Sequence, residues 1–239
     1  MKIEFSGQTV VVAGGTGGLG KAVSLAFLSE GAKTVVTYRN KEEFLALKDA
    51  AGSNRTLLEG YAVDVTKQSA TDQFANQIVA SHGKLDALIN AVGAYAGGIK
   101  LWDLDSTVLD HMLALNLRSG FVLSRAALPA MLRAGHGSIV NVAAKAAFDH
   151  GAGAGAYSAS KAAAVALMDS LARDCKGTGV RVNSILPSII DTPANRMAMP
   201  DADFATWPKP EDIATVILFL CSDSAKTIHG AAIPVYGNS

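Results

Sequence analysis

A run of glycines directly after a short apolar stretch constrains the fold of this chain more than any other feature. Residues 10–20 read VVVAGGTGGLG, and five of the seven residues from Gly14 to Gly20 are glycines. A strand that enters such a loop can approach a pyrophosphate with its backbone, and the helix that follows offers free N–H groups. A tight turn without a ligand needs fewer glycines, so the pattern predicts a dinucleotide-binding turn. The residues expected to bind are Gly14, Gly15, Thr16, Gly17, Gly18, Leu19 and Gly20, in the register Gly15-x-Gly17-x-x-Gly20 or Gly14-x-x-x-Gly18-x-Gly20.

Apolar segments rich in β-branched residues alternate with segments of helical period along the rest of the chain. The expected strands cover residues 9–13, 33–38, 60–63, 85–91, 138–143, 180–186 and 231–236. The expected helices cover 21–30, 72–81, 105–133 with a break or bend near Pro129, 156–175 and 211–220. Continuous apolar strands are typical of a parallel sheet with helices on both faces. We predict an α/β fold, a Rossmann-type doubly wound parallel sheet that forms a single domain over residues 1–239.

The proline-containing stretch over 187–210 is the least regular part of the sequence. In an open α/β sheet, loops that follow the carboxyl ends of strands line the ligand crevice. We therefore expect a substrate lid around residues 188–210, with a surface loop of no function as the alternative.

Composition and charge exclude several classes of protein. Lys+Arg and Asp+Glu both number 21, so no overall positive field attracts nucleic acid or an anionic membrane. No apolar run approaches the roughly 18 residues of a membrane span, and the first residues do not resemble a secretion signal. Cys175 and Cys221 lie far apart, which fits a reducing cytoplasm, and the five histidines lack the spacing of metal ligands. We expect a cytoplasmic protein without a metal.

The end of the second expected strand bears on the choice of cofactor. In dinucleotide-binding folds an acid about 20 residues after the loop usually holds the ribose 2′-hydroxyl. Residues 37–40 read TYRN and contain no acid. The planar guanidinium of Arg39 suits a 2′-phosphate, although a solvated surface arginine is the alternative. The sequence therefore favours NADP over NAD.

A tyrosine and a lysine four residues apart lie in the expected helix over 156–175. This spacing in the run YSASK puts Tyr157 and Lys161 on one helical face. A nearby ammonium stabilises a phenolate and lowers the pKa of the phenol, so Tyr157 could exchange a proton near neutral pH. The spacing alone is common, but after a dinucleotide loop it predicts a catalytic pair.

With these motifs, the chain resembles the short-chain dehydrogenase/reductase family nearly from end to end. The resemblance implies an oxidoreductase acting on a small molecule, and a homodimer or homotetramer. In this pattern Tyr157 supplies a proton, Lys161 tunes it and holds the ribose, and Asn116 in LNLRSGF helps hold a water-linked proton relay. The further cofactor contacts that it implies are Asp64 and Val65 on the adenine side, Asn90 and Ala91 in the stretch that corresponds to Asn-Asn-Ala-Gly, and Pro187, Ile190 and Thr192 over the nicotinamide.

One position departs from the pattern of the family. The catalytic serine of the family lies thirteen residues before the tyrosine; here that position is Ala144, and no Ser, Thr or Tyr follows it before Ala156. Loss of one positioned donor costs roughly 3–4 kcal/mol where a carbonyl must be polarised. The alanine therefore implies either weak catalysis or a substrate that needs little polarisation, and a conjugated imine or quinonoid ring, which accepts hydride readily, fits the second. His150 and Asp149 are further candidates for substrate contact.

Two segments resemble dihydropteridine reductases, which also lack this serine. They are residues 144–149, AKAAFD, and residues 192–207, TPANRMAMPDADFATW. Phe204 and Trp207 could stack on a flat heterocycle or pack the lid onto the core. That group typically uses NADH and carries an acid after the second strand, which this chain lacks. We predict an NADP-dependent reductase of a pre-activated ring imine such as quinonoid dihydropterin. A 3-oxoacyl thioester reductase and a non-catalytic cofactor-binding sensor or scaffold are the alternatives.

Overall fold

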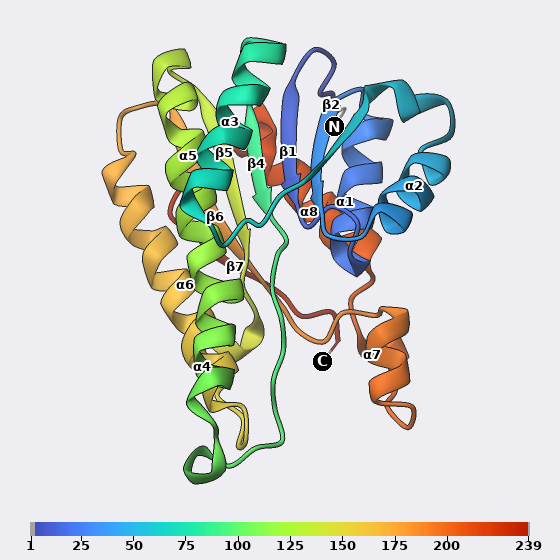
Figure 1. Cartoon of the computed structure of the whole chain (residues 1–239), viewed down its shortest axis with the longest axis vertical. Helices are drawn as coiled ribbons and strands as arrows, with labels where there is room; N and C mark the ends of the chain where they lie inside the picture. The colour runs from blue at the N-terminus through green and yellow to red at the C-terminus, as the bar shows by residue number, and fades with distance from the viewer. Residues whose placement is uncertain (1–2, 239) are drawn as a thin grey trace.

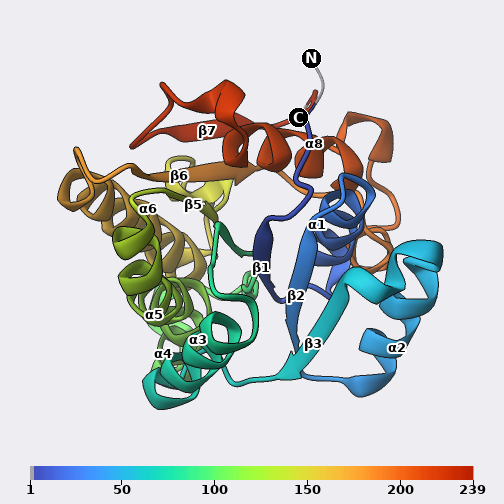
Figure 2. The same cartoon turned by 90° about the horizontal axis from the view of Figure 1, so that it is seen from above.

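The structure is a computed structural model, and it describes residues 3–238. A parallel sheet of seven strands in the order β3-β2-β1-β4-β5-β6-β7 runs through its centre (Figures 1 and 2). The strands are β1 (Thr9–Ala13), β2 (Lys33–Tyr38), β3 (Leu58–Ala62), β4 (Ala87–Asn90), β5 (Gly137–Val142), β6 (Val180–Pro187) and β7 (Ala232–Val235). The strand order reverses between β1 and β4, so the predicted doubly wound Rossmann-type fold is confirmed.

Helices cover both faces of this sheet. They are α1 (Gly18–Ser29), α2 (Lys41–Ala50), α3 (Gln68–His82), α4 (Ser106–Leu113), α5 (Ser119–Ala134), α6 (Gly155–Asp174), α7 (Pro193–Ala198) and α8 (Pro210–Cys221). Seen from above in Figure 2, α1, α2 and α8 lie on one side of the sheet, and α3, α4, α5 and α6 lie on the other. None of the helices in the described part of the chain is long and apolar enough to cross a membrane.

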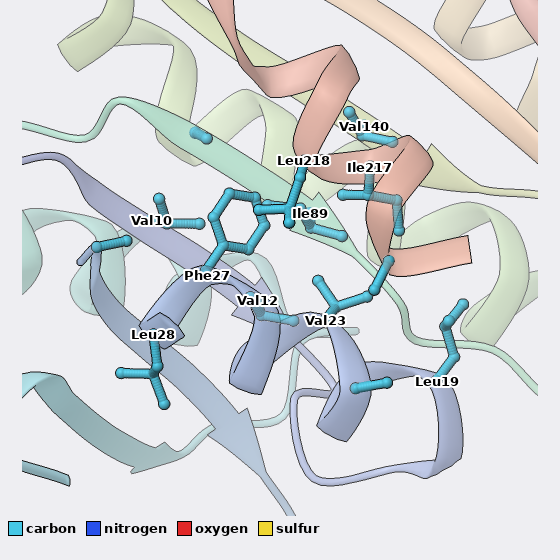
Figure 3. Packing of buried hydrophobic residues seen from close by; sticks show 14 of the residues in the cluster. Val10, Val12, Leu19, Val23, Phe27, Leu28, Ile89, Val140, Ile217 and Leu218 are labelled. Atoms are coloured by element: carbon cyan, nitrogen blue, oxygen red, sulfur yellow. The ribbon is translucent and has the colours of Figure 1, made fainter. Parts of the chain in front are cut away.

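The alternation of side chains along β1 divides the core into two layers. Val10 and Val12 pack with α1 and α8, as Figure 3 shows, and this layer includes the fully buried Phe27. Val11 and Ala13 face the opposite layer, with side chains of α3, α5 and α6. Because both faces of the strand are covered, every residue of β1 is buried. The packed layers hold the loop after β1 in a fixed place at the edge of the sheet.

The long helix expected over 105–133 is interrupted at a different place from the one predicted. The chain leaves α4 through a π-helical turn at Ala114–Arg118 and continues as α5, and Pro129 lies inside α5. A π turn inserts an extra residue into a helix, and such turns occur frequently at functional sites. Here the turn carries Asn116, whose side chain bonds to the backbone of Ala94 and to Ser160.

Two regular elements were not expected from the sequence. Helix α2 follows β2 directly, and the stretch over 187–210 contains the short helix α7. Thr192 caps α7, since its hydroxyl accepts a hydrogen bond from the Asn195 N–H at 3.2 Å, and Pro193 occupies the first turn, where its missing N–H costs nothing. In Figure 1, α7 and the chain that leads from β4 to α4 both project beyond the carboxyl ends of the strands.

Candidate active site

A cavity of about 710 Å³ lies where the strand order reverses, at the carboxyl ends of β1 and β4. Ligands bind at this switch point in open α/β sheets. The predicted cofactor residues that line it are Gly14, Thr16, Gly17, Arg39, Asp64, Val65 and Ala91. The predicted residues outside its lining are Gly15, Gly18, Leu19, Gly20, Asn90, Tyr157, Lys161, Pro187, Ile190 and Thr192. The cavity therefore brings together four separate parts of the predicted site: the glycine loop, the end of β2, the chain after β3 and the chain after β4.

Close packing requires glycine at several positions of the loop after β1. Gly14 has a φ of 73°, and its N–H donates to the Thr37 hydroxyl at 3.0 Å. A Cβ at Gly20 would lie 2.0 Å from the Gly14 carbonyl oxygen, and one at Gly15 would lie 2.5 Å from a methyl of Val36. Three of the glycines are thus required for the tight turn itself. Bare backbone at the start of α1 is the arrangement that a pyrophosphate needs.

Charged groups gather at the end of the cavity that lies beyond β2 and β3. Arg39 follows β2, and Asp64 follows β3. The Asp64 carboxylate accepts hydrogen bonds from the Thr66 N–H at 3.0 Å and from its hydroxyl at 2.6 Å. These two bonds hold the pKa of Asp64 below its ordinary value. This end of the cavity is therefore suited to the polar adenosine half of a dinucleotide.

Tyr157 and Lys161 both lie in α6, but their pKa values differ from the sequence-based expectation. Burial, with a smaller effect of Tyr95, raises the pKa of Tyr157 to about 12, whereas the lysine was expected to lower it. Burial also lowers the pKa of Lys161 to about 8, and its Nζ donates to the Val142 carbonyl oxygen at 2.9 Å. Desolvation is the largest cause of both shifts. Tyr157 is therefore a neutral phenol, the form that can donate a proton.

Asn116 connects three segments around this pair. Its Oδ1 accepts from the Ala94 N–H at 2.9 Å, and its Nδ2 donates to the Ala94 carbonyl at 3.0 Å and to Ser160 Oγ at 2.9 Å. The Ser160 hydroxyl donates in turn to the Tyr157 carbonyl oxygen at 2.7 Å. The buried amide thus fixes the π turn and the chain after β4 against the N-terminal part of α6.

Gly93 lies between the cavity and Lys161, one member of the predicted catalytic pair. It lines the cavity, and a Cβ at this position would lie 2.9 Å from Asn116 Oδ1 and 3.1 Å from Lys161 Nζ. Only glycine leaves the space between these two polar groups open. This is where the resemblance to the family expects the water-linked relay.

Asn90, the last residue of β4, forms hydrogen bonds that stabilise the backbone next to the site. Its amide donates to Asn141 Oδ1 at 2.9 Å and to Ser119 Oγ at 3.3 Å, and its oxygen accepts from the Val92 N–H at 3.3 Å. The Asn90 side chain is buried. These contacts hold the chain after β4 in place.

The segment expected over the nicotinamide approaches the glycine loop at one point. A Cβ at Gly18 would lie 2.9 Å from a methyl of Thr192. Pro187 ends β6 and Ile190 packs against the core layer of α1 and α8. The chain after β6 therefore lies across the start of α1.

Ala144 is buried just beyond the end of β5, with an extended backbone. In the turn that follows, Lys145 Nζ lies 3.9 Å from the Asp149 carboxylate, and His150 Nε2 lies 3.1 Å from the Ala147 carbonyl oxygen. The two residues considered for substrate contact, Asp149 and His150, thus have partners within their own loop.

Two aromatic residues were not identified from the sequence. The rings of Tyr95 and Tyr157 meet edge to face, with centroids 5.0 Å apart, and Tyr95 is 70% exposed. His111 of α4 lines the cavity together with Ala114 and Leu115. The available signals were the position of Tyr95 in the loop that follows β4, a switch-point strand, and the helical spacing of the α4 residues.

The aromatic residues of the 192–207 segment pack against each other. The rings of Phe204 and Trp207 are 5.0 Å apart, and the Arg196 guanidinium lies 4.9 Å from the Phe204 ring. Trp207 is buried, and Arg196 forms an ion pair with Asp191. For Trp207 this is the packing role that we considered beside stacking on a heterocycle.

The buried lysine leads to a prediction about stability and pH. Its pKa is about 8 in the folded protein and 10.5 as the ordinary value, so the unfolded chain binds more protons between these values. The penalty for burying Lys161 is complete below pH 8 and is relieved as the pH rises. From pH 8 to 10 the unfolding free energy of the parent should rise by about 2 kcal/mol relative to Lys161→Met.

Urea unfolding of the nucleotide-free parent and of the variant at several pH values measures this difference. Burial raises the pKa of Cys221 to about 12 and of Tyr157 to about 12, and both groups oppose the trend as the pH rises. Because both proteins contain these groups, their effect cancels in the difference. Parallel pH curves for the two proteins would show that Lys161 is not desolvated in this way.

The known proteins similar to this chain in sequence and in structure are dehydrogenases and reductases. A family model described as short chain dehydrogenase matches residues 8–203. D-threitol dehydrogenase of Mycolicibacterium smegmatis is 34% identical over 250 residues, which cover 98% of this chain and 93% of that protein. The 3-oxoacyl-(acyl-carrier-protein) reductase FabG of Thermotoga maritima is 29% identical, with 98% of each chain covered. A short-chain type dehydrogenase/reductase structure from Mycobacterium ulcerans has a TM-score of 0.92 at 27% identity, covering 98% of this chain and 90% of that chain.

Proposed function

The chain belongs to the short-chain dehydrogenase family of NAD(P)-dependent oxidoreductases, and from this premise we propose that it is an NADP(H)-dependent reductase of pre-activated ring imines. Quinonoid dihydropterin is the representative substrate. The observation that carries the proposal is a neutral, largely buried Tyr157 beside Lys161 and Asn116, with Ala144 where the family pattern has a serine. The site has a proton donor but no hydroxyl at the position that would polarise a carbonyl.

A dinucleotide fits the cavity and the glycine loop, because glycines leave the backbone of the loop accessible to a pyrophosphate. Arg39, Asp64 and Thr16 would hold the adenosine half, and Lys161 the ribose next to the nicotinamide. When bound, the cofactor supplies the hydride that the substrate accepts.

The residues of the chain supply the proton and the orientation. The raised pKa of Tyr157 keeps its hydroxyl protonated at neutral pH, so it can donate to the substrate nitrogen. Lys161, fixed by the Val142 carbonyl, faces the open space beside Gly93, where water held with the help of Asn116 would return a proton to Tyr157. The exposed ring of Tyr95 provides a flat apolar wall next to the donor.

Two alternatives remain beside this reading. A 3-oxoacyl thioester reductase is favoured by the similarity to the Thermotoga maritima enzyme of that name. A non-catalytic sensor or scaffold is favoured by the alanine at position 144, whereas the complete set of Asn116, Tyr157 and Lys161 argues for catalysis.

A substrate panel tests the function. Cofactor oxidation would be followed optically with pterins, quinones, imines and oxoacyl thioesters, using the full chain. The proposal expects quinonoid dihydropterins or related ring imines to have the highest kcat/KM. Turnover of any member excludes the scaffold, and a thioester as the best substrate would replace the ring-imine reading.

The cofactor preference leads to a separate prediction. NADPH should bind at least several-fold more tightly than NADH, because Arg39 can pair with a 2′-phosphate. Arg39→Ala should remove most of this preference, which titration of each cofactor against both proteins measures. Equal affinities in the parent would contradict the prediction.

The remaining features of the proposal concern the setting of the site. We propose that the segment around 188–210 closes over the substrate, since Thr192 already contacts the start of α1. Members of the family act on small molecules and are commonly oligomeric, and we propose a homodimer or homotetramer. We also propose a cytoplasmic location, which fits the free thiols of Cys175 and Cys221.

A further inference from the structure

A carboxylate shares the adenosine end of the cavity with Arg39. Glu43, in the first turn of α2, lines the cavity together with Arg39 and Thr16. The Thr16 hydroxyl donates to Glu43 Oε2 at 2.9 Å. This contact joins the glycine loop to α2 across 27 residues of sequence. The end of β2 lacks the acid usual in such folds, but the cavity has an acid from the next helix.

The position of Glu43 is fixed by the contacts of α2. Asn40 caps the helix by accepting from the Glu42 N–H at 2.8 Å, and the rings of Tyr38 and Phe44 stack with centroids 4.9 Å apart. A Cβ at Gly60 would lie 2.2 Å from the Phe44 ring, so the ring rests directly on the backbone of β3. The first turn of α2 is therefore held against the end of β2, and Glu43 with it.

We propose that Glu43 is a specificity-determining residue that limits the preference for a 2′-phosphorylated cofactor. Its carboxylate can accept a hydrogen bond from a free ribose 2′-hydroxyl, the role that an acid at the strand end performs in related folds. The same carboxylate repels a 2′-phosphate, which carries about −1.5 to −2 charges. The inference rests on the proposed binding of a dinucleotide in this cavity.

The hydroxyl of Thr16 can donate either to Glu43 or to a bound 2′-phosphate, but not to both. A threonine has one O–H donor, and it is directed at Glu43. A phosphate that takes this donor must first break the bond to Glu43 and leave the carboxylate beside a second anion. Arg39 shares the cavity lining with two carboxylates, Glu43 and Asp64. Lys67 is a second cation that acts on Asp64 but does not line the cavity. We therefore expect a modest NADPH preference instead of exclusive use of it.

The test uses Glu43→Gln, which keeps the shape of the side chain and its ability to accept from Thr16 while removing the charge. The probes are 2′,5′-ADP and 5′-AMP, which differ only in the 2′-phosphate, with binding measured by calorimetry. The affinity for 2′,5′-ADP should rise by about fivefold to tenfold, the scale expected for a like charge at a partly exposed site, and the affinity for 5′-AMP should stay level or fall.

Glu42→Gln is the matched control. Glu42 lies one residue earlier in the same helical turn and is not among the cavity residues. Glu42→Gln therefore removes the same negative charge from the N-terminus of α2 as Glu43→Gln, but removes none from the cavity. It should leave the ratio of the two affinities within about twofold of the parent. High salt should reduce the gain in Glu43→Gln, because it screens the repulsion in the parent.

The outcomes separate this inference from the proposed function. An unchanged ratio in Glu43→Gln, or the same change in Glu42→Gln, overturns the role of Glu43 while leaving cofactor binding intact. A merely structural role would change both affinities together and would also leave the ratio unchanged. Failure of the parent to bind either nucleotide would overturn the proposed function along with the inference.

Discussion

Tyr157→Phe is expected to lower turnover of the best substrate by roughly 100-fold or more, the usual effect of losing an acid or base group. The change removes only the hydroxyl, so the ring contact with Tyr95 and the first turn of α6 should persist. Nucleotide affinity should therefore remain near that of the parent. Steady-state kinetics with the best substrate, together with a nucleotide titration, measure both quantities.

The expected pH dependence follows from the same hydroxyl. Because burial raises the pKa of Tyr157 to about 12, the donor stays protonated through neutral pH, and its own ionisation should not limit reduction there. Tyr61→Phe is a suitable control, since it removes a hydroxyl that donates to Glu59 on β3, away from the site. A Tyr157→Phe enzyme that reduces its substrate at nearly the parental rate would show that another group donates the proton.

The strands, and the placement of Tyr157 and Lys161 in one helix, were predictable because their signals are local. The bounds of β1 and β2 match the expected 9–13 and 33–38, since both are continuous β-branched runs bounded by glycine or polar residues. The Tyr157–Lys161 spacing is set by one helix, so it needs no tertiary information. The family resemblance added residues from other loops, and the strand order confirms the sheet on which they are placed.

The remaining features depend on contacts between distant segments. Nothing in the period of the 105–133 pattern marks the extra residue of the π turn, whereas Pro129 resembles a helix breaker although it lies inside α5. The raised pKa of Tyr157 depends on burial and on Tyr95, which is contributed by another loop. The Thr16–Glu43 contact required the unpredicted helix α2.

Ala144→Ser is expected to raise reduction of simple ketones or oxoacyl thioesters by roughly tenfold or more, while changing reduction of the ring imine little. A donor at an oxyanion-type position is worth roughly 3–4 kcal/mol when it is well placed, and a newly introduced serine should recover part of that. The ring imine does not depend on this donor, because its conjugation already makes it electrophilic. The ratio of the two kcat/KM values is the informative quantity, since damage to the site would lower both.

Ala146→Ser provides the matched control, because it adds the same hydroxyl two residues later, at a half-buried position in the same turn. It should leave the ratio of the two kcat/KM values unchanged. Ala144 is itself buried, so thermal unfolding should accompany the kinetics to show that the added hydroxyl fits. If the parent already prefers an oxoacyl thioester, another group must polarise the carbonyl. His150 and Asn116 would be the first candidates, and each would have to exchange a present backbone contact, with Ala147 or Ala94, for the substrate.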